Sequence, residues 1–137
     1  MSCRWISRCV VVLLLLAELT GCGGGHVAGG TRGTLHAGSV LLGDIQVTVH
    51  RVDGAIFDVV GAGITRADGR FDLVQPGARS ALHLSPGEYR VTLESVGAVP
   101  LWFAHEYYSA KTSPLHVNWT IKSLQLDLDI PLPVAGR

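Results

Sequence analysis

The chain has 137 residues, of which 47% are hydrophobic, and its 11 basic residues balance 11 acidic ones. That length is enough for one domain and rarely for two. The even charge, with no run of like-charged residues, lacks the electrostatic footprint of nucleic-acid or anionic-membrane binding. We therefore expect a single domain without a nucleic-acid partner.

The first 21 residues have the layout of a secretory signal peptide. Arg4 and Arg8 make the start basic without any acid, and an uninterrupted apolar run follows from Cys9 to Ala17. This run is shorter than the roughly 20 apolar residues that a bilayer-spanning helix needs. We therefore expect a cleaved signal peptide over 1–21 rather than a transmembrane anchor.

A cysteine follows at the point where cleavage is expected. The sequence Leu19-Thr20-Gly21-Cys22 resembles the lipobox of bacterial lipoproteins, which implies diacylglyceryl on the sulfur of Cys22 and cleavage just before it. Two acyl chains give stable anchoring, so the membrane would be a partner through this lipid. An ordinary secretory signal whose cleavage site contains a cysteine is the alternative, and Glu18 is the one residue that suits a lipobox poorly.

The lipobox implies a protein of the bacterial cell envelope, held to a membrane by lipid. Gly23 stands where enteric-type bacteria place the aspartate that favours inner-membrane retention, so we expect anchoring in the outer membrane or on the periplasmic face of a membrane. Residues 22–32 are rich in glycine and are expected to form a flexible tether. The domain is then expected at 33–137.

Short stretches of alternating apolar and polar residues, separated by glycine, proline and aspartate, predict β-strands from residue 31 onward. The clearest strands are expected at 45–50, 89–94, 115–121 and 124–130, and three more at 31–36, 59–66 and 70–74. A hairpin turn at Asp68-Gly69 should join the last two, because glycine supplies the positive φ of a tight turn. Seven antiparallel strands without a convincing helix predict an all-β sandwich.

Several segments carry a resemblance to one domain family. In chain order these segments are Gly33–Leu35, Gly43–Val49, Thr65–Leu73 and Leu84–Thr92. Together they resemble the succession of motifs in carboxypeptidase regulatory-like domains, and Tyr107–Leu115 with Leu126–Leu128 resembles the C-terminal part of planctomycete-type lipoproteins that carry this domain. The resemblance covers residues 33–131 and implies a seven-stranded Greek-key sandwich of the transthyretin-like kind.

One turn departs from the family pattern. The family carries an aspartate directly after the threonine ahead of the hairpin, whereas Arg66 follows Thr65 here. The resemblance therefore does not extend to side-chain bracing of this turn, while the expected fold is unchanged.

The sequence shows no catalytic pattern. No histidine is followed three residues later by glutamate, as in the carboxypeptidases to which such domains are attached, and a zinc site needs at least three convergent ligands. The urate-pathway hydrolase of the same fold ends in Tyr-Arg-Gly-Ser, whereas this chain ends Val134–Arg137. Asp53-Gly54 and Asp68-Gly69 lack the further aspartates of a calcium loop and predict turns. We expect no catalytic residue, no metal and no cofactor, and so no enzyme.

The segment 99–108 is dense in aromatic residues. Exposed rings at Trp102, Tyr107 and Tyr108 would suit a protein of the envelope or a carbohydrate. Alternatively, Trp102, Phe103 and one tyrosine fold back as core, which we favour because a small domain without disulfides needs that burial. We expect a non-catalytic binding or structural module, with a protein partner as the first hypothesis and a carbohydrate as the second.

Overall fold

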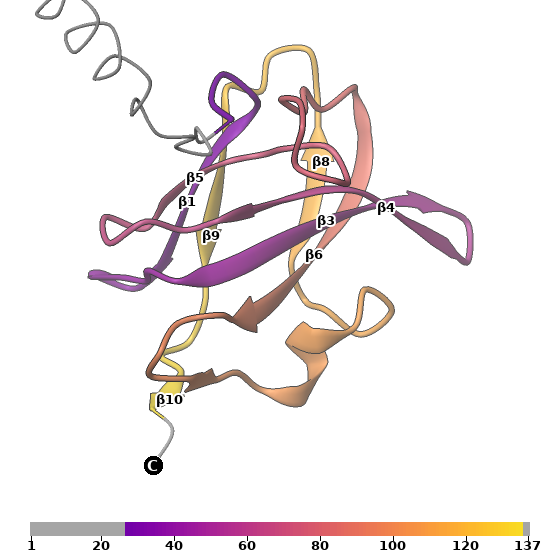
Figure 1. The fold of residues 1–137 in the computed structure, drawn as a ribbon. Coiled ribbons are helices and arrows are strands. Elements are labelled where there is room, and N and C mark those ends of the chain that lie inside the picture. Colours follow the sequence, from indigo (N-terminus) through magenta and orange to yellow (C-terminus); the bar gives the residue numbers. More distant parts are fainter. Residues whose placement is uncertain (1–26, 136–137) are drawn as a thin grey trace, which may run out of the picture.

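The computed structural model describes residues 27–135, which form β-strands and one short 3-10 helix without any α-helix (Figure 1). The elements are β1 (Arg32–Ala37), β2 (Val40–Leu41), β3 (Ile45–Asp53), β4 (Ile56–Ile64), β5 (Arg70–Asp72), β6 (Gly87–Ser95), β7 (Leu101–Trp102), η1 (His105–Tyr108), β8 (His116–Trp119), β9 (Gln125–Asp129) and β10 (Val134–Ala135). The predicted signal peptide, Cys22 and the first part of the predicted tether lie outside the described residues. Within residues 27–135, no helix has the length and hydropathy to cross a bilayer.

Two larger sheets and one small ribbon contain these strands. One sheet has the order β4-β3-β6-β8 and is antiparallel throughout. In the other sheet, β1 pairs along one edge with β5 and then β2, and along its other edge with β9. The β1–β9 pair is parallel, so the prediction that all strands are antiparallel is wrong at this place. A two-stranded ribbon of β7 and β10 completes the described part of the chain.

The predicted alternation is confirmed on the long strands, and it builds one core. Buried side chains come from β3 (Ile45, Val47, Val49), from β6 (Tyr89, Val91, Leu93), and from the other sheet (Leu35, Phe71, Leu126, Leu128). They belong to one continuous hydrophobic cluster. Because successive side chains of a strand point to opposite faces, each of these strands covers the core with one face and meets solvent with the other.

The turn at Asp68-Gly69 forms, but the strands on its two sides separate into different sheets. The Gly69 N–H donates to the Arg66 carbonyl at 2.8 Å, and Gly69 has a φ of +74°. β4 continues on β3, whereas β5 pairs with β1. The expected hairpin ladder is reduced to a bridge between Ala62 and Val74, so this turn carries the chain from one sheet to the other.

Candidate contact surfaces

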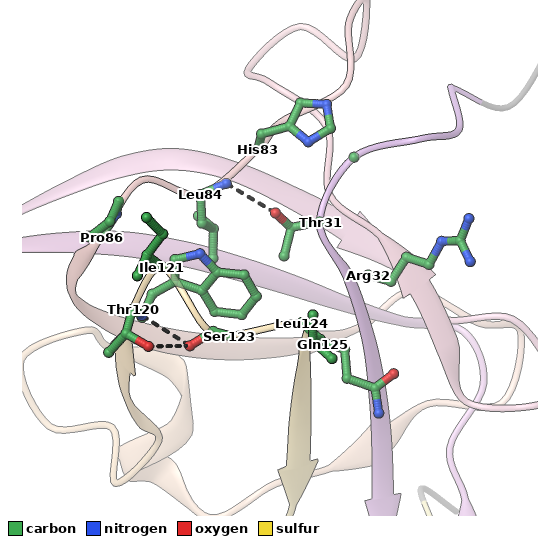
Figure 2. Close-up of a pocket in the computed structure, with 12 residues that line it drawn as sticks. Thr31, Arg32, His83, Leu84, Pro86, Thr120, Ile121, Ser123, Leu124 and Gln125 are labelled. Atoms are coloured by element: carbon green, nitrogen blue, oxygen red, sulfur yellow. Dashed lines mark hydrogen bonds between the residues drawn. The ribbon is translucent and has the colours of Figure 1, made fainter.

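Thr31 fixes the point at which the chain enters the domain. Its side chain is 8% exposed, and its backbone N–H donates to the Leu82 carbonyl at 2.7 Å. Its carbonyl accepts from the Leu73 N–H at 2.9 Å, and its hydroxyl oxygen accepts from the Leu84 N–H at 3.0 Å (Figure 2). β1 follows at Arg32, one residue ahead of the predicted start of the domain. The segment that leads back to Cys22 therefore departs from a rigid position.

The predicted aromatic site is divided between surface and core. Trp102 is 60% exposed and Tyr108 is 41% exposed, whereas Phe103 and Tyr107 are buried. The Phe103 ring centre lies 6.5 Å from that of Tyr107 and 6.2 Å from that of Tyr108. Burial and the neighbouring Glu106 carboxylate raise the pKa of Tyr107. The predicted burial is therefore confirmed for Phe103 and for one tyrosine, Tyr107. It is wrong for Trp102, which lies on the surface.

Hydrogen bonds hold this aromatic segment in one conformation. The Tyr108 hydroxyl oxygen accepts a hydrogen bond from the Phe103 N–H at 3.1 Å, so the exposed ring is tied to the backbone beside it. After η1, the buried hydroxyl of Ser113 donates to the Val91 carbonyl of β6. The guanidinium of Arg90 donates to the Ser113 carbonyl at 3.0 Å. The segment is therefore fastened to the β4-β3-β6-β8 sheet, and the exposed rings sit on a fixed support.

The ribbon of β7 and β10 presents Trp102 beside a second exposed apolar residue. Trp102 is the direct cross-strand partner of Val134, which is 70% exposed. Pro131 and Pro133 precede this strand, and proline in a run demotes a strand signal, which explains why the sequence did not predict β10. We name Trp102 and Val134 the ribbon patch.

A hollow of about 640 Å³ lies at the end where the chain enters (Figure 2). Its lining includes Gly30, Thr31 and Arg32 from the entering chain, His83, Leu84 and Pro86, and Trp119, Ile121, Leu124 and Gln125 around the β8–β9 turn. The lining contains no carboxylate, and its one arginine, Arg32, is paired with Asp72 outside the lining, with Nε 3.7 Å from Oδ1. The sequence placed Ile121 and Leu124 in strands, but β8 ends at Trp119 and β9 begins at Gln125, so this part of the prediction is wrong.

A histidine and two aspartates brace the outer face of the parallel pair β1–β9. The His36 Nε2 lies 2.8 Å from Asp127 Oδ1, and its Nδ1 lies 2.9 Å from the Gly38 carbonyl oxygen. Asp129 Oδ1 accepts from the Gly38 N–H at 2.9 Å and lies 3.4 Å from His36 Nδ1. The hydrogen bond to Asp127 is the main cause that raises the pKa of His36. Across residues 27–135, no three or more His, Cys, Asp or Glu side chains gather in a way that could hold a metal ion.

No protein-family model, no curated protein and no solved structure matches this chain. The resemblance to carboxypeptidase regulatory-like domains therefore stays a prediction from the motifs.

Proposed function

We propose that the chain is a lipid-anchored protein of the bacterial cell envelope whose β-domain is a non-catalytic binding module. The lipobox-like Leu19–Cys22 supports the anchor. The core shared between the two larger sheets supports a transthyretin-like sandwich of the carboxypeptidase regulatory-like kind. The membrane is reached through diacylglyceryl on Cys22, and no cofactor takes part.

The ribbon patch is the observation that supports a protein partner best. Trp102 and Val134 face each other across the ribbon and are both more than half exposed. Aromatic residues are enriched at protein–protein contacts, and tryptophan frequently carries a large share of the binding energy. An aliphatic residue beside the indole gives a flat apolar surface that suits a protein side chain. We therefore assign the binding of an envelope protein to this ribbon.

A carbohydrate is the second candidate because two aromatic rings remain exposed. Trp102 and Tyr108 offer the apolar faces on which sugar rings stack. Two observations weigh against it: Tyr107 is buried, and the Tyr108 hydroxyl already accepts a hydrogen bond from the Phe103 N–H. This leaves fewer free groups for recognising sugar hydroxyls than the three-ring site expected from the sequence.

The anchor is tested by the intact mass of protein purified from membranes, wild type beside Cys22→Ser. We expect a mature chain that begins at Cys22 and carries acyl mass, and we expect the substitution to abolish both the mass and membrane retention. An unacylated chain cleaved elsewhere would contradict the anchor.

The ribbon patch is tested by placing a photoreactive phenylalanine analogue at residue 102 in cells. The matched control position is Ile56, which is 59% exposed at the start of β4. We expect a discrete protein adduct from residue 102 alone, and Trp102→Ser should abolish binding of the identified partner to the purified protein. Identical adducts from both positions would refute the patch. Quenching of tryptophan fluorescence by an envelope polysaccharide in the wild type but not in Trp102→Ser, which retains Trp119, would instead favour the carbohydrate.

A further inference from the structure

The end of the domain at which the chain enters also carries its most exposed apolar side chains. Ile121 is 91% exposed and Leu124 is 90% exposed, the highest values among the large apolar residues of the described chain. Both residues line the same hollow as Gly30 and Thr31. Figure 1 shows the β8–β9 connection at the same end of the domain as the described residues that lead into β1, while β10 lies at the opposite end.

The exposure of these residues is imposed by a braced turn. The Ser123 N–H donates to the Thr120 carbonyl at 3.0 Å, which closes a four-residue turn with Ile121 and Lys122 at its tip. The Thr120 N–H donates to Ser123 Oγ at 2.9 Å (Figure 2), and the Lys122 N–H donates to Thr120 Oγ1 at 3.3 Å. Two of these three hydrogen bonds use side chains of the turn itself as acceptors. The turn therefore holds Ile121 outward instead of letting it fold back on Trp119.

The entering chain places this turn close to the lipid that the lipobox implies. Cys22 stands eight residues ahead of Gly30. Eight extended residues span at most about 29 Å, and Thr31 fixes the exit point by hydrogen bonds to Leu73, Leu82 and Leu84. With acylated Cys22 in the bilayer, Gly30 thus lies within about 29 Å of the lipid anchor. The turn lines the same hollow as Gly30 and is therefore on the side of the domain nearest the membrane.

The chemistry of this end suits a lipid surface. The lining of the hollow contains no carboxylate, but the Arg32 guanidinium is paired with the Asp72 carboxylate, with Nε 3.7 Å from Oδ1. Lys122, at the tip of the turn, is therefore the cation that faces phosphate-bearing headgroups. Aliphatic side chains flanking a lysine can enter the boundary between headgroups and acyl chains while the ammonium stays in the polar layer. The ribbon patch, at the other end, remains directed away from the bilayer.

We propose that the Thr120–Leu124 turn docks on the bilayer in which Cys22 is anchored, with Ile121 and Leu124 inserted at the headgroup boundary. This inference rests on the proposed lipid anchor. The turn acts as a second contact that sets the orientation of the domain, so that the ribbon patch faces outward toward its partner.

The experiment uses the mature acylated protein in vesicles of phosphatidylcholine and phosphatidylglycerol. No cysteine occurs after Cys22, so Ile121→Cys introduces one free thiol for a fluorophore whose emission depends on polarity. The matched control is Leu132→Cys, an apolar residue that is 68% exposed in the segment leading to β10. Lipids with a nitroxide near the headgroup then quench a label that touches the bilayer.

We expect several-fold stronger quenching of the label at 121 than of the label at 132. A further Leu124→Asp substitution should abolish the quenching at 121, whereas Leu132→Asp should leave it unchanged. Equal and weak quenching at both positions in protein of the acylated mass would overturn the docking and leave the anchor intact. Absence of the acyl mass would overturn both proposals. If the emission of the label at 121 reports an apolar environment only at high protein density on the vesicles, the label contacts a second copy of the chain. This result would also overturn the docking.

Discussion

Gly33 and Phe71 are direct partners in the ladder between β1 and β5, and the phenylalanine ring lies over the glycine. A Cβ atom at residue 33 would stand 2.2 Å from Cζ of Phe71, a fully buried residue. Gly63 on β4 approaches the same ring from the other sheet, where a Cβ atom would stand 3.1 Å from Cδ2. A glycine in each larger sheet thus makes room for one ring at the centre of the core.

Gly33→Ala should lower the free energy of unfolding by about 1–3 kcal/mol, because the added methyl group forces the Phe71 ring from its position. Denaturant unfolding measures this change. Thr34→Ala, at the next residue of β1 and on its half-buried face, is the matched control and should cost less. Equal losses of unfolding free energy in Gly33→Ala and Thr34→Ala would mean that the Phe71 ring can make room for the added methyl group at no energetic cost.

Thr31→Val should lower the free energy of unfolding by about 1–3 kcal/mol, because it leaves the buried Leu84 N–H without its acceptor. The same unfolding experiment measures it, with Thr34→Val as the control. We also expect faster amide hydrogen exchange at Leu84 in the Thr31 variant. Unchanged exchange there would show that the hydroxyl does not hold the entering chain.

The imidazole of His36 should titrate above the ordinary value of 6.5, since its hydrogen bond to Asp127 favours the charged form and raises the pKa. A folded-state pKa above the unfolded value means that the contribution to stability is complete below about pH 6.5. It is lost as the pH rises through the folded-state pKa. Nuclear magnetic resonance titration of the ring measures the midpoint.

Asp127→Asn should lower the titration midpoint of His36 more than Asp129→Asn, because the hydrogen bond to Asp127 is the largest cause of the raised pKa and Asp129 acts through charge alone. Both carboxylates come from β9, so the two variants perturb the same strand. Equal shifts from the two substitutions would argue against the hydrogen bond as the main cause.

Phe103→Ala should lower the free energy of unfolding by about 3 kcal/mol or more, since the ring belongs to the core. Trp102→Ala should change it by about 0.5 kcal/mol or less, because the indole is largely exposed. Thermal unfolding of both variants measures the contrast. A large loss from Trp102→Ala would identify the indole as structural and weaken its assignment to partner contact.

The chain by itself determined the faces of the long strands and the places of the tight turns. Alternation along 45–50 and 89–94 requires only that one face be buried, which is a local property of the strand, and both segments bury the predicted residues. Glycine at 54 and 69 predicted the turns for an equally local reason, the positive φ that both adopt. The lipobox-like Leu19–Cys22 is likewise a local pattern, and it stays a prediction because that segment lies outside the described residues.

Only the tertiary structure decided which strands pair and which apolar residues stay exposed. The parallel pairing of β9 with β1, and the passage of the chain from β4 to β5 between sheets, depend on packing between segments far apart in sequence. The alternation predicts strands at 115–121 and 124–130, which include Ile121 and Leu124, and no local signal shows that these two residues lie outside the strands. The hydrogen bonds between Thr120 and Ser123 form a turn that separates β8 from β9 and leaves Ile121 and Leu124 exposed. The polar groups of this turn bond to one another, so they require no hydrogen bonds from a neighbouring strand.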